Sequence, residues 1–458
     1  MRISGDVVAH RVQKLMMSLT LLACLFLSFV GGALLAHFEL IPGFGASPDS
    51  DTDTAERHGL SPGRVALGAE HPALVGSLPE IAPDTFSGVR SYDSTRAWEG
   101  FTLISPSSPA APVRLIDMDG ETRHEWRIPD ALLRPAIPVA GAAAATSLPT
   151  IQAQLVEEGD LIVAVSAADQ LGNGGIARIN KAGELLWQYR GFVRENFAVT
   201  PDGRIYALLR SKRTDPWPGL ERIETPFFDD VILQLDSSGA EIRRVSILAA
   251  IQNSPFLYLL QYTDPDRHAG DLLGASAINV LDVGQAALLP NASAGDILLS
   301  LRQLDVIAVL GLDEPVIKWA ARGTWHLQSD IDVLDNGNIL LFDGHGDLAR
   351  GAGARVMEID PLTLGTQWMF PAKNGRQLLS HSGGSQQRLP NGNTLISDAG
   401  GGRLLEVTSA GDVVWEYRIP RDDYAGLLPA PMPLRAAAAS RFSREQLELL
   451  LGPTGASQ

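Results

Sequence analysis

The chain has 458 residues, of which 45% are hydrophobic, and its formal net charge is −16 at pH 7. That much apolar material can form a large core. The acidic balance argues against nucleic acid as a partner, because a phosphate backbone requires basic patches on the protein. The single cysteine, Cys24, excludes a disulfide within the chain.

A long apolar run without charge, Leu15 to Ala36, follows a segment that carries Arg2, Arg11 and Lys14. The run is long enough to span a bilayer as a helix, and the basic residues before it favour a cytoplasmic N-terminus. We therefore expect a single-pass inner-membrane protein with a cytoplasmic segment 1–14, a transmembrane helix 15–36 and a periplasmic or extracytoplasmic remainder. Two alternatives stay open. In the first, the run is part of a signal peptide that is cleaved off. In the second, Leu21-Leu22-Ala23-Cys24 is a lipoprotein processing site.

Residues 37–95 are rich in Pro, Gly, Ser and Asp, a composition typical of a flexible stalk. After the stalk, a strand-turn-strand phrase recurs between residues 96 and 420. Its first half places Asp202-Gly203, Asn336-Gly337-Asn338 or Asn391-Gly392-Asn393 between apolar strands, and these are strong hairpin signals. Its second half ends in a strand that usually carries tryptophan: Trp126, Trp187, Trp319, Trp368 and Trp415.

The second-half phrase occurs around Gly120, Gly183, Gly239, Asp313, Gly365 and Gly411. Repeats of about 40–50 residues with four strands each indicate β-propeller blades. We therefore predict an all-β fold, a six-bladed β-propeller over residues 96–420, with the tryptophans packed between blades. The remaining residues, 421–458, read as a C-terminal extension. In it, Ser443-Arg444-Glu445-Gln446 is a capping box that predicts a short helix ending before Gly452-Pro453.

Four phrases in the same order resemble the bacterial arylsulfotransferase family: residues 295–302, 323–328, 334–343 and 387–396. The resemblance covers roughly residues 98–420. It implies a six-bladed propeller with a funnel-shaped site on its axis. There a histidine takes a sulfuryl group from an aryl sulfate and passes it to a phenol, with no cofactor and no nucleotide-type sulfate donor.

The chain departs from this family at the residues that carry the chemistry. Family members usually place histidine directly after the Gln of the Trp-x-x-Gln phrase, but here Ser329 follows Gln328. The family's Asp-x-x-His phrase ends here in Gly274, and the histidine expected before the Asp-Gly hairpin is replaced in Arg194-Glu195-Asn196. Of that set only Arg302 matches.

Sulfuryl transfer needs cations around the sulfuryl oxygens, a nucleophile, and an acid or base for the phenolic oxygen. The candidate catalytic residues are Ser329, His326 and His381, with His326 the nearest base for Ser329. The candidate substrate-binding residues are Arg302, Gln328, Arg388 and Arg355. His345 reads as a polar turn residue, and the histidine spacing does not indicate a metal site.

Three functions stay open. The first is a membrane-anchored, exported arylsulfotransferase-like enzyme for a small aryl sulfate and a phenolic acceptor, impaired by its replaced histidines. The second is a catalytically inactive propeller that binds an anionic or aromatic ligand or an envelope protein. The third is a quinoprotein-like scaffold. A fold alone cannot choose among them.

Overall fold

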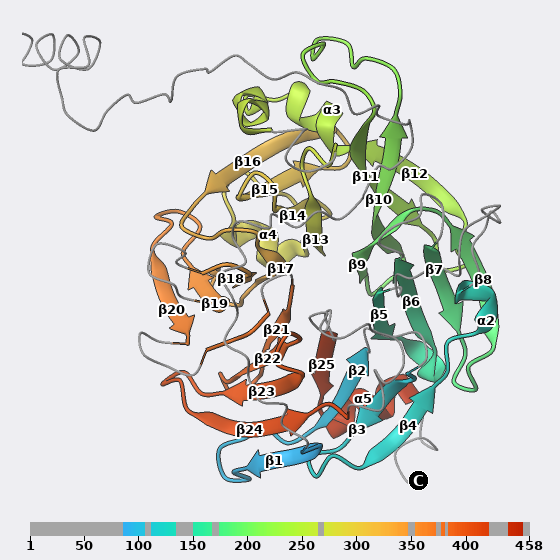
Figure 1. Ribbon diagram of the computed structural model, residues 1–458, viewed down its shortest axis with the longest axis vertical. Coiled ribbons are helices and arrows are strands. Elements are labelled where there is room, and N and C mark those ends of the chain that lie inside the picture. The colour runs from blue at the N-terminus through green and yellow to red at the C-terminus, as the bar shows by residue number, and fades with distance from the viewer. Residues whose placement is uncertain are drawn as a thin grey trace, which may run out of the picture. The chain divides into compact units, whose positions relative to one another are not determined.

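The computed structural model describes residues 86–105, 111–133, 150–166, 174–263, 270–346, 353–371, 377–380, 383–420 and 438–451. All lie in the second of two compact units, Ala66–Gln458. These residues form six antiparallel sheets arranged as blades around a common axis (Figure 1). The predicted all-β, six-bladed propeller is confirmed.

The first three blades are given from the inner to the outer strand. Blade 1 contains β25 (Ala438–Phe442), β2 (Phe101–Ser105), β3 (Val113–Ile116) and β4 (Thr122–Trp126). Blade 2 contains β5 (Thr150–Leu155), β6 (Leu161–Ser166), β7 (Gly174–Ile179) and β8 (Leu185–Arg190). Blade 3 contains β9 (Val193–Val199), β10 (Ile205–Arg213), β11 (Phe227–Leu235) and β12 (Glu241–Ser246).

The other three blades follow the same pattern. Blade 4 contains β13 (Ala275–Val280), β14 (Ile297–Leu301), β15 (Val306–Gly311) and β16 (Val316–Arg322). Blade 5 contains β17 (Ser329–Val333), β18 (Ile339–Asp343), β19 (Arg355–Ile359) and β20 (Thr366–Phe370). Blade 6 contains β21 (Ser385–Arg388), β22 (Thr394–Asp398), β23 (Arg403–Val407), β24 (Val413–Arg418) and a fifth strand, β1 (Gly88–Tyr92).

The turn glycines explain why the inner hairpins form where the sequence predicts them. Gly203, Gly337 and Gly392 have φ angles of 79°, 84° and 85°. This left-handed conformation is strained for a residue with a Cβ atom, so the Asp-Gly and Asn-Gly pairs fix the turn between the first and second strands of blades 3, 5 and 6.

Tryptophans on the fourth strands of blades 1, 2, 5 and 6 join each of these blades to the next one. The indole Nε1 of Trp126 donates to Gly159 O at 3.0 Å, and that of Trp415 donates to Met118 O at 2.9 Å. Trp187 and Trp368 reach Ser237 O and Ser409 O in the same way, at 3.1 and 2.8 Å. The predicted packing of tryptophans between blades is therefore confirmed, with a hydrogen bond at four of the junctions.

The ring is closed by both ends of the described chain. β25 supplies the inner strand of blade 1, and β1 pairs with β24 at the outer edge of blade 6. The propeller therefore extends beyond the predicted bounds of 96–420. β1 lies in the segment interpreted as a stalk, and β25 lies in the segment interpreted as an extension.

Six short helical segments complete the described fold: α2 (Asp130–Leu133), η1 (Glu157–Gly159), α3 (Ile247–Gln252), η2 (Leu257–Tyr262), α4 (Val283–Leu288) and α5 (Arg444–Leu451). α5 begins at the predicted capping box, since Gln446 N donates to Ser443 Oγ and Ser443 N donates to the Gln446 side chain. Its Leu447 and Leu451 are buried against blades 1 and 2.

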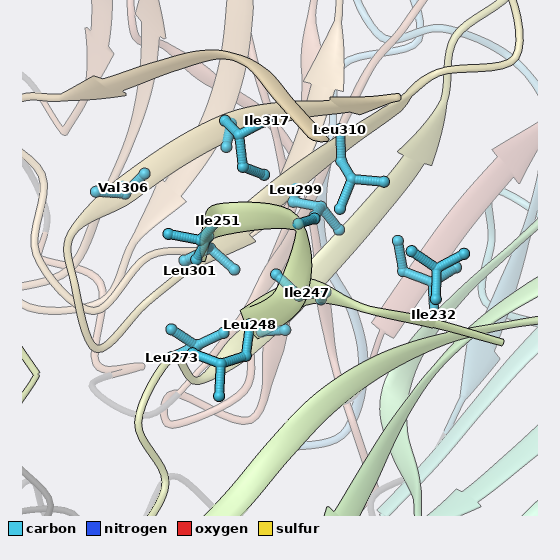
Figure 2. Packing of buried hydrophobic residues seen from close by; sticks show 14 of the residues in the cluster. Ile232, Ile247, Leu248, Ile251, Leu273, Leu299, Leu301, Val306, Leu310 and Ile317 are labelled. Carbon is cyan, nitrogen blue, oxygen red and sulfur yellow. The ribbon is translucent and has the colours of Figure 1, made fainter. Parts of the chain in front are cut away.

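The largest apolar cluster fills the space between blades 3 and 4 under α3. Ile247, Leu248 and Ile251 of the helix pack against Leu299 and Leu301 of β14 (Figure 2). This packing fixes the connection that leads from blade 3 to the start of blade 4.

No helix among the described residues is long and apolar enough to cross a membrane. The predicted transmembrane segment, Leu15 to Ala36, lies outside the described ranges.

Candidate functional site

The two ends of the propeller carry different residues. We call the end at which the inner strands begin the upper face; Arg194, Gly274, Gln328 and Gly384 lie there, at or beside the first residues of β9, β13, β17 and β21. The end with the Asp-Gly and Asn-Gly turns is the lower face. Because strands alternate in direction, the loops joining the second and third strands also lie on the upper face.

The structure places most of the predicted site residues on the upper face. Ser329 begins β17, Arg355 begins β19, Arg302 follows β14, and His326 lies in the loop between β16 and β17. Arg388 ends β21 and therefore lies at the lower face. His381 lies outside the described residues.

His326 is held by an aspartate from a different loop. Its Nδ1 lies 2.7 Å from Oδ1 of Asp305, in the turn between β14 and β15. The backbone N–H of Leu327 donates to the same oxygen at 3.2 Å, and Arg322 approaches Oδ2 at 3.4 Å. Burial alone would raise the pKa of Asp305, but the hydrogen bond and charge of His326, together with Leu327 and Arg322, lower it. Asp305 is therefore an ionised acceptor at neutral pH.

The loop that carries His326 is supported by Asp343 at the end of β18. Oδ1 of Asp343 accepts the backbone N–H groups of His326 and Gly346, both at 3.1 Å. Its Oδ2 accepts Nε of Arg355 at 2.7 Å, and Nη2 of Arg355 donates to Thr324 O at 2.8 Å. Arg355 therefore braces the loop next to His326.

Backbone strain gathers around the same histidine. Six non-glycine residues of the described chain have positive φ, and three of them are Asp305 at 55°, Leu327 at 51° and Asp330 at 39°. Such conformations cost about 1–3 kcal/mol each and persist where the surrounding structure fixes them, often at functional sites. The His345 ring meets His326 edge-on, with 5.3 Å between centroids.

Ser329 and Gln328 make contacts between blades. Ser329 Oγ donates to Gly384 O of blade 6 at 3.1 Å, and Gly384 N lies 3.4 Å from the same oxygen. The buried side chain of Gln328 donates to Val306 O at 2.9 Å, and its backbone oxygen accepts Ser276 Oγ of blade 4 at 2.8 Å. Their roles in chemistry stay predictions, since no contact joins Ser329 to His326 in the described structure.

The two other positions where the family resemblance implies histidine are adjacent in space. Nη2 of Arg194 contacts both carboxylate oxygens of Asp271, at 2.8 and 2.9 Å, and Gly274 N donates to Asp271 at 3.2 Å. Gly274 has a φ of 62°, and a Cβ atom there would lie 2.5 Å from Gln303 Cγ and 2.9 Å from Arg302 Cγ. The side chain of Arg302 therefore passes over the glycine that replaces a family histidine.

Arg194 also binds Asp230 at 2.9 Å, and Arg210 contacts Asp271 while lying over the Phe192 and Phe228 rings. Burial raises the pKa of Asp230 to about 6 against the lowering charge of Arg194. Burial also acts to raise the pKa of Asp271, but Arg194 and Arg210 outweigh it and hold that pKa at about 2. The expected imidazoles are thus replaced by a network of two arginines and two aspartates, whose charges nearly cancel.

Arg388 is satisfied at the lower face. Its Nη2 lies 2.7 Å from Oε2 of Glu358, and its guanidinium lies 5.2 Å from the centre of the Trp368 ring. Both partners belong to blade 5, whereas Arg388 belongs to blade 6. The structure therefore separates Arg388 from His326, Ser329 and Arg302.

Sequence reasoning missed Asp305 and Arg322, which no local motif marks. Both belong to blade 4 and are brought together by the pairing of β15 with β16, where Val306 lies opposite Arg322. Asp343 ends the phrase 334–343, but its contact with the loop of His326 joins residues 17 apart in the chain. Among the described residues, no three His, Cys, Asp or Glu side chains gather as a metal site would require. What the upper face offers chemically is an imidazole oriented by a carboxylate, with arginines nearby.

Several solved structures superpose on part of this chain. A protein of unknown function from Bacteroides caccae superposes with a TM-score of 0.47 and 15% identity, over 75% of this chain and 100% of that one. Virginiamycin B lyase from Staphylococcus aureus gives 0.36 and 13%, over 72% and 88% of the two chains. No curated protein matches the chain. The family model described as arylsulfotransferase (ASST) matches residues 152–419, which span blades 2 to 6. The chain belongs to the arylsulfotransferase (ASST) family.

Proposed function

We propose that this protein transfers a sulfuryl group from an aryl sulfate to a phenolic acceptor, with His326 as the group that carries it. The observation that supports this proposal is the 2.7 Å contact between His326 and Asp305, in a chain whose family is defined by this chemistry. An imidazole fixed by a carboxylate is the nucleophile that the chain retains after losing the family's usual histidines.

The hydrogen bond to Asp305 decides which nitrogen reacts. An ionised carboxylate only accepts hydrogen bonds, so Nδ1 of His326 carries the hydrogen and Nε2 carries the lone pair. In the first step Nε2 attacks the sulfur and the sulfur–oxygen bond to the aryl group breaks. The electron pair leaves on the phenolate, which takes a proton from solvent. In the second step the acceptor oxygen attacks the same sulfur, the nitrogen–sulfur bond breaks, and the phenolic proton leaves to His345 or solvent.

The negative oxygens of the sulfuryl group need a cation close to His326. Arg322 meets this need, because its half-exposed guanidinium already lies beside Asp305. It also lies 4.5 Å from the centre of the exposed Tyr262 ring, which offers a surface for the aryl part of the substrate. Arg302, predicted from the resemblance, belongs to the same turn as Asp305, between β14 and β15.

A second candidate function is binding without transfer. It is favoured by the filling of the three family histidine positions with structural contacts: Ser329 with Gly384, Gly274 under Arg302, and Arg194 with Asp271. A propeller that keeps cations at the upper face without a competent nucleophile would retain aryl sulfates and release no phenol.

The test is to offer the purified protein an aryl sulfate, with and without a phenol. Transfer predicts phenol release that depends on the acceptor. His326→Ala should lower the rate at least about 100-fold, and Asp305→Asn about 10–100-fold. Asp313→Asn, a control at a fully exposed position, should change nothing. Binding of aryl sulfate without phenol release supports the second function, and transfer that survives His326→Ala contradicts the role of His326.

We also propose that residues 15–36 anchor the protein in the inner membrane with the propeller on the periplasmic side. The apolar run and the basic residues before it support this orientation. A reporter active only in the cytoplasm, fused after Gln458, should give no signal. Strong reporter activity would show the opposite orientation.

A further inference from the structure

Two half-buried carboxylates on one inner strand lack the ion pairs that the buried carboxylates of the described structure form. Every buried aspartate or glutamate in the described ranges forms an ion pair with arginine or lysine. Asp330 and Asp332 on β17 are half-buried and have no arginine or lysine partner within those ranges. Burial raises the pKa of Asp332 to about 6, and burial together with the charge of Asp332 raises that of Asp330 further. An unpaired pair of carboxyls in such a place is unfavourable unless something binds it.

The neighbours of these carboxyls come from the inner strands on both sides. Asn279 of β13 approaches Oδ1 of Asp332 through Nδ2 at 3.5 Å. The backbone N–H of Gln386 in β21 donates to Asp330 Oδ2 at 2.9 Å, and the Gln386 side chain hydrogen-bonds Asp332. Three consecutive blades therefore meet at this point beside the propeller axis, where β13, β17 and β21 run (Figure 1).

The amide oxygens at the same place have no donors. Gln386 is only 4% exposed, and within the described chain its Oε1 accepts no hydrogen bond. Oδ1 of Asn279 is buried and equally unpartnered there. A buried acceptor left unpaired costs about 1–3 kcal/mol, so two together indicate that a ligand belongs with them. The side chains of Asn279 and Gln386 hydrogen-bond Asp332, and Nε2 of Gln386 also lies 3.5 Å from Leu340 O. A half-turn of either amide exchanges its nitrogen for its oxygen beside the carboxylates.

We propose that Asn279, Asp330, Asp332 and Gln386 form a site for a hard divalent cation, with calcium the best match. Carboxylate and amide oxygens are the ligands that calcium takes, in flexible arrangements, whereas magnesium requires a near-ideal octahedron. Two carboxylates balance the charge of one divalent ion. The site is separate from His326 and does not depend on sulfuryl transfer. Its cation would join the inner strands of blades 4, 5 and 6.

The experiment uses the full-length protein after treatment with chelator. Calcium chloride should bind with a stoichiometry near one and raise the melting temperature by about 2–5 °C at saturation, because the ion binds the folded state only. Magnesium chloride at the same ionic strength should raise it less. Asp332→Asn should abolish the response to calcium, and in chelator it should melt no lower than wild type, since it removes an uncompensated charge.

Asp313→Asn is the matched control, because it makes the same chemical change at a fully exposed side chain. It should keep the calcium response. If Asp332→Asn does not fold, Asp330→Asn tests the same point. The absence of calcium binding to wild type overturns the proposal. So does an equal response in wild type and both site variants, which would place the ion elsewhere. Stability that depends on pH and not on calcium also overturns it, and assigns the carboxyls a shared proton instead.

Discussion

Arg388 and Arg441 occupy equivalent positions on the inner strands of consecutive blades. Each guanidinium lies over a tryptophan of the preceding blade, Trp368 at 5.2 Å and Trp415 at 4.4 Å. Each also pairs with a glutamate on the third strand of that blade, Glu358 or Glu406. The repeat explains Arg388 as an inter-blade contact, because Arg441 performs the same task where no substrate could be bound.

This equivalence predicts unequal losses of stability. Arg441 and Glu406 are fully buried, so Arg441→Met should lower the free energy of unfolding by about 3–5 kcal/mol. The Arg388 pair is partly exposed, so Arg388→Met should cost less, about 1–2 kcal/mol. Urea unfolding followed by tryptophan fluorescence measures both. An Arg388→Met variant with unchanged stability and weaker aryl sulfate binding would restore the predicted substrate role.

The hydrogen bond from Trp126 to Gly159 O should contribute to the contact between blades 1 and 2. Trp126→Phe removes the donor and part of a fully buried ring, which predicts a loss of about 2–4 kcal/mol. Trp319→Phe is the comparison, because Trp319 is only partly buried and makes no such bond among the described residues. Equal losses in the two variants would mean that the hydrogen bond contributes little.

Gly274 should resist substitution because of its backbone and its neighbours together. Gly295 has a similar φ of 85° but open space around it, so Gly295→Ala measures the backbone strain alone. Gly274→Ala adds a contact with Gln303 and Arg302 and should cost about 1–3 kcal/mol more. Gly274→His would meet the same neighbours, and Ser329→His would leave Gly274 and Arg194 in place of the family's other histidines. Neither variant alone should therefore restore the family's usual reaction. A gain in transfer rate from either single variant would contradict this account.

Asp332 predicts a specific dependence of stability on pH when chelator is present. Its folded pKa of about 6 lies above the ordinary value of 3.8. The folded state therefore binds the proton more tightly, and the resulting stability is complete below pH 4 and is lost as the pH rises through 6. Between pH 4 and 7, wild type should lose about 1–3 kcal/mol relative to Asp332→Asn. Calcium should reverse this loss. Parallel profiles of stability against pH for wild type and Asp332→Asn would contradict the raised pKa of Asp332.

The parts of the fold that the sequence predicts are those encoded by neighbours in the chain. An Asp-Gly turn specifies the hairpin that contains it, and the capping box at Ser443 specifies the start of α5. β1 and β25 escape this reasoning because their partners are remote. Gly88 pairs with Arg418, and Phe442 pairs with Phe101, so nothing adjacent to either strand reveals that it belongs to a sheet.

The residues of the candidate site are likewise predictable only where neighbours in the chain mark them. The family phrases lead to residues that lie on the upper face, and His326 can be selected as the histidine nearest to Ser329. Asp305 could not be selected, because it lies 21 residues from His326 in a turn without a motif. Arg388 illustrates the opposite case, in which the pattern predicts a substrate-binding role and the observed contacts favour a structural one. A cation on an inner strand satisfies the pattern of a channel residue, while the sequence gives no indication of the tryptophan and glutamate that enclose it.

The two closing strands, β1 and β25, differ in what their loss would do to the ring. β1 is attached along one edge only, to β24, whereas β25 is the strand that completes blade 1. Tension applied through the N-terminal segment would therefore act first on the five-residue strand β1 and peel it from blade 6. All six blades would keep four strands and the ring would stay shut. Loss of the pairing between β1 and β24 would therefore leave complete the ring that carries the upper face.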